Sequence, residues 1–160
     1  MKHNNNGFTL IETIIVISLL GVISFGLGSF IMTAMQSWVL ISGRESAVNS
    51  GRVAMNRLVT EIKRVKKPQN MITYTSSICS FQDVDTQAVT FEQSSANLLR
   101  NGSILATGLL TPTGLLFTYL GSTGEVVTAK QNIRSVRVWL SLSAGGQRVT
   151  IESAARIRNL

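Results

Sequence analysis

The sequence predicts an α+β protein in which one long N-terminal helix spans a membrane and packs by its C-terminal half on a small antiparallel β-sheet domain. The apolar stretch from Phe8 to Leu40 exceeds the roughly 20 residues that cross a bilayer as a helix. No charged residue occurs between Glu12 and Arg44. After Pro68 the apolar residues instead recur with a period of two, which is the spacing of strands.

The helix is expected to continue beyond its membrane segment. Met55, Leu58 and Ile62 recur at helical spacing in an amphipathic stretch, and a proline at position 68 ends the element. The apolar block is also too long for a cleavable secretory signal. We therefore expect a helical region at residues 8–67, with a membrane part at about 8–40, an amphipathic part at about 41–67 and a last helical turn near Val65.

The remaining residues, 68–160, are predicted to form one antiparallel β-sheet domain. Asn101-Gly102 favours positive φ at both central positions of a tight hairpin, and Gly121 to Gly124 is typical of a turn. Apolar and polar residues alternate from Val136 to Leu142 before Gly145-Gly146 leads into a returning strand. The expected strands lie at 71–75, 88–92, 98–100, 104–106, 115–120 and 136–142, and around Val149 and Ile151.

Composition limits the classes of partner and chemistry. The chain of 160 residues carries 15 lysines and arginines against 8 acidic residues, a formal charge of +7 that favours anionic partners without selecting one. Cys79 is the single cysteine, so no internal disulfide can form, and its apolar neighbours favour a buried thiol.

The first residues contain a specific motif. Gly7-Phe8-Thr9-Leu10-Ile11-Glu12 follows a short polar leader that contains Lys2, and it opens the apolar helix. This segment resembles the processing site of type IV prepilins and type II secretion pseudopilins. The resemblance implies a leader at residues 1–7, cleavage between Gly7 and Phe8 by a prepilin peptidase, N-methylation of Phe8, and a role for Glu12 in subunit assembly.

The chemistry of Glu12 is consistent with that resemblance. A carboxylate at the start of a membrane helix is costly and needs a cationic partner. Cleavage at Gly7 would create an amino group at Phe8, which could neutralise the carboxylate of a neighbouring subunit in a filament. The alternative is an ordinary signal-anchor helix, in which Glu12 only complements the helix N-terminus.

The resemblance implies a structural subunit of a type IV pilus or a type II secretion filament. The chain would be inserted in the bacterial inner membrane with its β domain outside the cytoplasm, and would then join other pilin or pseudopilin subunits. The C-terminal cysteine pair of many major pilins is absent, as is the proline often found in their membrane helix. Both absences favour a minor subunit. The layout of the chain, including its final Arg156-Ile157-Arg158, resembles minor subunits associated with filament tips.

Two other hypotheses remain open. A basic tip subunit could bind DNA or another polyanion, as in a competence pilus, because clustered cations release counterions on contact. The candidate cations are Lys63, Arg64, Lys66 and Lys67, which a solvated helix end would also explain. Arg134, Arg137, Arg148, Arg156 and Arg158 form a second basic group, which charge protection of a sheet edge or face would also explain. A tethered domain that never polymerises would leave Gly7 uncut.

Enzymatic activity is not predicted. The sole histidine, His3, lies in the leader, and no nucleophile with a nearby base, phosphate-binding glycine loop or Cys/His metal spacing occurs. Asp83 and Asp85 stand nearly alone, whereas a hard cation needs several oxygen ligands. We therefore expect no catalytic residue, no cofactor and no metal.

Overall fold

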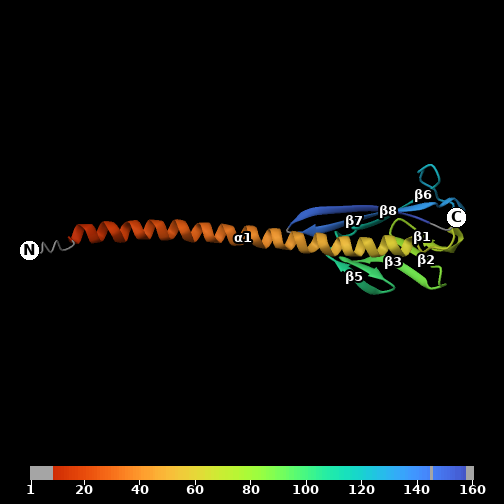
Figure 1. Ribbon diagram of the computed structural model, residues 1–160, viewed down its shortest axis with the longest axis horizontal. Coiled ribbons are helices and arrows are strands. Elements are labelled where there is room, and N and C mark those ends of the chain that lie inside the picture. Colours follow the sequence, from red (N-terminus) through yellow and green to blue (C-terminus); the bar gives the residue numbers. More distant parts are fainter. Residues whose placement is uncertain (1–8, 145, 158–160) are drawn as a thin grey trace, which may run out of the picture. The chain divides into compact units, whose positions relative to one another are not determined.

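The computed structural model describes residues 9–144 and 146–157 (Figure 1). Gly7 and Phe8 of the predicted processing site lie outside these residues. The chain divides into two compact units, Met1–Ile41 and Ser42–Leu160. Helix α1 (Leu10–Ile62) contributes residues to both units, and all strands belong to the second.

Backbone hydrogen bonds define where helix α1 begins and ends. The carbonyl of Thr9 accepts the amide of Thr13 at 3.2 Å, so the helix starts immediately after Thr9. At the other end, the amide of Val65 bonds to the carbonyl of Ile62 at 3.1 Å, and Val65 itself pairs with Asp83 as an isolated antiparallel bridge. The helix therefore ends at Ile62, earlier than the expected end near Val65, because Val65 is already part of the sheet domain.

Within the described residues of the second unit, eight antiparallel strands form two sheets, which confirms the predicted antiparallel β domain. The five-stranded sheet has the order β1-β2-β3-β4-β5, so each strand pairs with its neighbour in sequence. The three-stranded sheet has the order β6-β7-β8. The bounds are β1 Met71–Tyr74, β2 Ile78–Gln82, β3 Ala88–Ser94, β4 Asn97–Arg100, β5 Ser103–Thr107, β6 Leu115–Leu120, β7 Ser135–Ala144 and β8 Gln147–Arg156, with short 3-10 turns at Pro68–Asn70 and Lys130–Asn132.

The predicted hairpin at Asn101-Gly102 is confirmed. Both residues have positive φ, 49° and 78°, and they connect β4 to β5 with Arg100 opposite Ser103. The Asn101 side chain also accepts the amide of Thr90 at 2.7 Å. The turn is therefore tied to the adjacent strand β3.

Strand β2 was not predicted from the sequence. Cys79, Ser80 and Phe81 are all buried in succession, so the strand lacks the alternation of apolar and polar residues that identifies a half-exposed strand. Ser80 is accommodated because its hydroxyl lies 2.9 Å from that of Thr90 on β3. The sequence pattern therefore did not identify this strand, because a buried serine that pairs with Thr90 interrupts the expected alternation.

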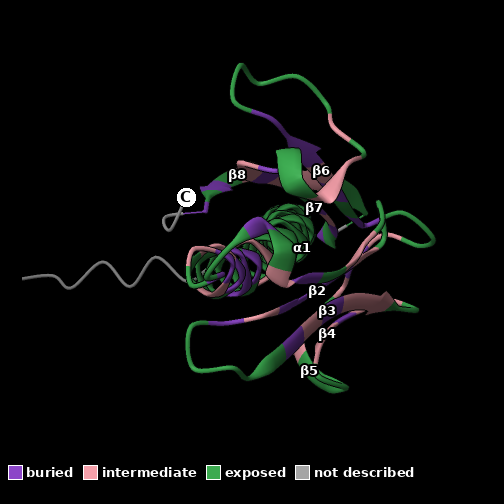
Figure 2. Ribbon diagram, turned by 90° about the vertical axis from the view of Figure 1, so that its right-hand side faces the viewer, coloured by how far each residue is buried: buried purple, intermediate pink, exposed green. Residues whose placement is uncertain are grey.

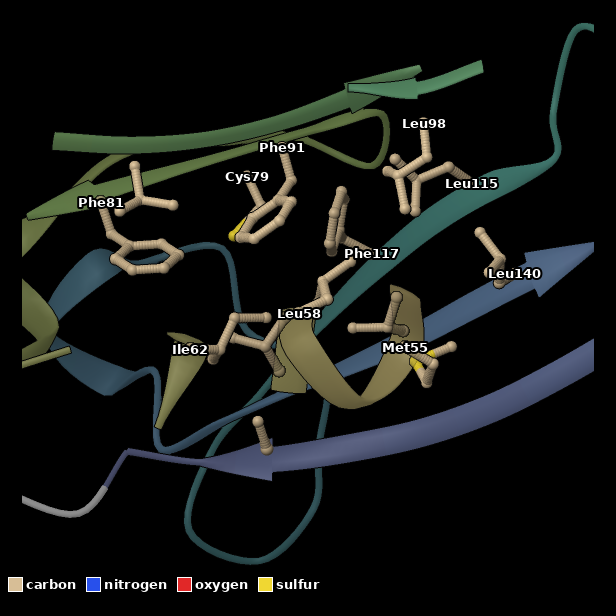
Figure 3. Close-up of a cluster of buried hydrophobic side chains, with 14 of the residues drawn as sticks. Met55, Leu58, Ile62, Cys79, Phe81, Phe91, Leu98, Leu115, Phe117 and Leu140 are labelled. Carbon is tan, nitrogen blue, oxygen red and sulfur yellow. The ribbon is translucent and has the colours of Figure 1, made fainter. Parts of the chain in front are cut away.

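The core lies between the two sheets and around residues 54–62 of α1 (Figures 2 and 3). Leu58 and Ile62 are fully buried and meet side chains from both sheets. Burial raises the pKa of the Cys79 thiol to about 12, so this side chain remains an uncharged core residue, as predicted. The labelled side chains in Figure 3 are Met55, Leu58, Ile62, Cys79, Phe81, Phe91, Leu98, Leu115, Phe117 and Leu140.

Gly51 allows α1 to approach the three-stranded sheet closely. A Cβ atom at this position would lie 2.6 Å from Cδ1 of Leu142 and 2.9 Å from Cδ1 of Ile151. These distances are shorter than carbon atoms tolerate without movement of the leucine or the isoleucine. The helix therefore lies close to the sheet at position 51, where a side chain would displace the terminal methyl groups of Leu142 and Ile151.

We predict that Gly51→Ala lowers the free energy of unfolding by about 1–3 kcal/mol, because overpacking outweighs the gain in helix propensity. Gly43→Ala is the matched control, since a Cβ at Gly43 meets no atom within 4 Å. Thermal unfolding of the full-length protein in detergent measures both changes. Equal stability of the two variants would contradict the close approach.

Candidate functional site

The start of α1 fixes the position of the one carboxylate in its apolar part. The hydroxyl of Thr9 accepts the backbone amide of Glu12 at 3.3 Å, which makes Thr9 the N-cap and Glu12 the third helical residue. Thr9 was not singled out in the sequence, although Thr-x-x-Glu before an apolar run is the spacing of a capping box. The cap holds Glu12 at the positive end of the helix dipole.

Glu12 is exposed and makes no salt bridge with any residue that the structure describes. Gly7 and Phe8, the other members of the predicted site, precede the described part of the chain. Of the three residues predicted to act in processing and assembly, the structure therefore describes only Glu12. Its carboxylate is available to a cation from outside residues 9–144 and 146–157.

The polar side chains that follow on α1 are compatible with a membrane. Hydroxyl groups donate to backbone carbonyls one turn earlier: Ser18 to Ile14 at 2.8 Å, and Ser37 to Thr33 at 3.0 Å. Ser29 and Thr33 make equivalent bonds. Internal partners remove the cost of an unpaired hydroxyl in hydrocarbon.

The apolar residues of the same segment have no cover within the first unit. Every described residue from Thr9 to Ile41 is exposed. The most apolar 18-residue window of α1 has a mean hydropathy of 2.5, so the helix is long and apolar enough to cross a membrane. This surface requires lipid or other apolar helices.

The predicted polyanion contact is altered by ion pairing. Arg64 forms salt bridges with Asp83, at 3.3 Å, and with Asp85. Lys66 and Lys67 are exposed, and Lys63 is half-buried. The structure therefore does not present four equivalent cations, because Arg64 is neutralised by the two aspartates.

A second set of ion pairs joins α1 to the five-stranded sheet. The carboxylate of Glu61, with a side chain only 15% exposed, accepts Nε of Arg57 at 3.0 Å and Nε of Arg100 at 2.8 Å. These residues and the Arg64 cluster line a polar cleft of about 490 Å³. Its three arginines balance its three carboxylates, so the cleft attaches the helix end to the sheet without a charge excess.

The arginines of the three-stranded sheet do not form one group either. Arg137 lies 3.4 Å from Glu152 on β8, and Arg134 donates to the carbonyl of Gln131 at 3.0 Å. Arg148 and Arg156 are exposed on β8. Arg158 falls outside the described residues. Trp139 on β7 is 37% exposed and lies opposite Glu152 in the pairing with β8.

The described residues contain no group of three or more His, Cys, Asp or Glu side chains placed to hold a metal ion. Asp83 instead accepts the amides of Asp85 and Gln87, both at 2.9 Å, through one carboxylate oxygen. Its other oxygen pairs with Arg64. The two aspartates, which stand nearly alone in the sequence, therefore take part in local structure.

Comparison with known proteins gives a match at the N-terminus of the chain. Residues 2–28 match a family model described as the prokaryotic N-terminal methylation motif. The match includes Gly7, Phe8 and Glu12 and stops within the membrane part of α1. No curated protein and no solved structure matches the chain significantly.

We predict that Glu61→Ala lowers the free energy of unfolding by about 1–3 kcal/mol, because Arg100 loses its carboxylate partner in a partly buried setting. Glu45→Ala, a change at an exposed helical glutamate with no salt bridge in the described structure, is the control and should be nearly neutral. Thermal unfolding in detergent provides the comparison. An equally small effect at Glu61 would show that the ion pairs do not stabilise the junction.

Proposed function

We propose that this type IV prepilin-like protein is a minor pilin or pseudopilin, cut after Gly7, methylated on Phe8 and assembled through α1 into a type IV pilus or a type II secretion filament. The observation that supports it most is the methylation motif at residues 2–28, at the start of an apolar helix whose Glu12 has no partner in the described chain. The fold, a long apolar helix packed on antiparallel sheets, is pilin-like.

The motif implies two classes of partner. A prepilin peptidase removes the leader, and other pilin subunits pack against the mature helix. Removal of residues 1–7 leaves an amino group at Phe8, close in sequence to the Thr9 cap. In our proposal this amine neutralises Glu12 of a neighbouring subunit, so that two isolated charges are removed together during assembly.

The exposed apolar surface has two successive roles in this proposal. Before assembly, α1 anchors the chain in the inner membrane with the β domain outside the cytoplasm. In the filament, neighbouring helices replace lipid around the side chains of residues 10–41. The same apolar surface therefore serves first as a membrane anchor and then as the subunit interface.

A minor position at or near a filament tip agrees with the composition of the chain. Cys79 is the single cysteine and is buried, so the chain lacks the terminal cysteine pair of many major pilins. Pilin-like proteins are typically structural rather than enzymatic. In this proposal the prepilin peptidase cuts and then methylates the chain, which has no reaction of its own.

Intact-mass analysis of the protein from its own cells tests the proposal. We expect the wild-type chain to begin at methylated Phe8 and Gly7→Ala to remain uncut, because the peptidase requires a small, flexible residue before the scissile bond. Gly21→Ala, at a glycine with open space around it, is a control that should be processed normally. A wild-type chain that begins at Met1 would support the signal-anchor alternative.

The alternative function is a polyanion-binding tip subunit, with DNA as the candidate ligand. Lys66 and Lys67 are exposed beside Pro68, and the chain has a formal charge of +7. Arg64 is expected to contribute less than these lysines, because it already pairs with two carboxylates.

In this alternative, Lys66→Ala with Lys67→Ala weakens binding of the full-length protein in detergent to duplex DNA and reduces its salt dependence by roughly two phosphate contacts. Fluorescence anisotropy at several salt concentrations measures both quantities. Arg44→Ala with Arg52→Ala, at two exposed arginines of α1 that have no salt bridge in the described structure, is the control with the same loss of charge and should bind as the wild type does. An absence of binding at low salt would exclude DNA as the ligand.

A further inference from the structure

We propose that the outer edge of strand β8 accepts an extended, acidic strand from a different subunit of the same filament, a proposal that rests on the filament role proposed above. The partner would extend the three-stranded sheet by one strand. Backbone hydrogen bonds would supply affinity, and opposite charges would set the register.

The proposal starts from a contrast among the four sheet edges. Strand β1 has four residues and a register shift between Met71 and Thr73. Strand β5 has five residues and faces a register shift between Leu98 and Leu99. Short and irregular edges of this kind resist pairing with other chains.

The edge at β6 is occupied by other parts of the chain. The amide of Phe117 donates to the carbonyl of Ser76 at 2.8 Å, and the amide of Val127 donates to the carbonyl of Tyr119 at 3.0 Å. Leu120 forms a bridge with Val126. Three of the four edges are therefore short, irregular or covered.

Strand β8 has none of these protections. All ten residues pair with β7 in one uninterrupted register, and the strand contains neither proline nor glycine. On the side away from β7, residues 147–156 make no backbone hydrogen bond to any other part of the described structure. A regular edge of this length is a template for another strand.

The pairing pattern identifies the groups that point outward. Ser141 and Ser143 of β7 donate their amides away from β8, to the carbonyls of Gly114 at 2.7 Å and Gly108 at 2.8 Å. Because backbone groups alternate sides along a strand, β7 bonds to β8 through its even-numbered residues. With Ser141 opposite Thr150, the residues of β8 whose amides and carbonyls face the open edge are Arg148, Thr150, Glu152, Ala154 and Arg156.

Charge at this edge specifies the chemistry of the partner. Glu152 already pairs with Arg137 at 3.4 Å, whereas Arg148 and Arg156 have no salt bridge in the described structure. These two arginines lie eight positions apart at opposite ends of the strand. An added strand with acidic side chains opposite both would be attracted, and a basic strand would be repelled.

A second copy of this chain does not fit the edge. Antiparallel pairing of two β8 strands would set Arg148 against Glu152. However, residues 42–62 of α1 run along β8 within the second unit (Figure 1), so in this pair the two β domains, with these helical residues, would point in opposite directions. Subunits of one filament share a single direction along its axis, so two β domains in that filament cannot face each other in this antiparallel way. Parallel, in-register pairing would instead bring each arginine close to its own copy.

Photo-crosslinking in the protein's own cells tests the proposal with the full-length chain. A benzoylphenylalanine probe at Thr150, on the outward edge, should crosslink to an extended acidic segment of another subunit with a prepilin motif. The same probe at Ile104 on β5, 62% exposed, is the positional control and should not. Peptide mapping of the crosslink identifies the partner segment.

Ala154→Pro separates the backbone interaction from side-chain effects. Proline removes an amide that β7 does not use, so the fold should be retained while the crosslink yield falls roughly five- to tenfold. Ala154→Ser keeps the amide and should crosslink normally. If Ala154→Pro unfolds the domain, Arg148→Glu combined with Arg156→Glu provides the second test and should give a similar loss.

The outcomes distinguish this proposal from the filament role. Intact mass of the same sample reports whether Phe8 is the first residue. Three results with a processed chain would overturn the edge proposal alone. They are a crosslink at β8 to a second copy of this chain, no crosslink at β8, and a crosslink that survives both variants. An uncut chain would overturn the filament role, and the edge proposal with it.

Discussion

The apolar surface of residues 10–41 is the constraint on which the other features depend. Nothing in the first unit covers these side chains, and all are exposed. Burying them elsewhere is worth roughly 25 cal/mol for each Å² removed from water. The segment therefore carries a single carboxylate, at Glu12, and bonds the hydroxyls of Ser18 and Ser37 internally. A helix built in this way needs an environment supplied by lipid or by other chains.

The second half of the same helix has the opposite role, because it organises the core of its own domain. Leu58 and Ile62 fill the space between the two sheets, and Gly51 allows close contact with β7 and β8. Glu61 then joins the helix to β4 through Arg100. Packing and this ion pair therefore hold residues 54–62 of α1 to the sheets of the second unit.

Local signals in the sequence predicted the helix and the hairpin, whereas features that depend on distant partners were missed. The long apolar run and Asn101-Gly102 each act within a few residues. Strand β2 was missed because its three central residues are all buried. The division into two sheets and the neutralisation of Arg64 depend on contacts between segments far apart in the chain. Such contacts cannot be predicted from the periodicity or the composition of the sequence.

The distribution of ion pairs explains why a chain with a charge of +7 need not be a general polyanion binder. Arg57, Arg64 and Arg100 are matched by three carboxylates in one cleft, so these arginines contribute to folding rather than to an external field. Cations without a salt bridge in the described residues lie elsewhere, and they include Lys66, Lys67 and the arginines at the two ends of β8. On β8 they flank backbone groups that lack partners in the described chain. A charge beside an open strand edge can discriminate among partners that also form backbone hydrogen bonds with that edge. A net positive charge spread over the surface cannot discriminate in this way.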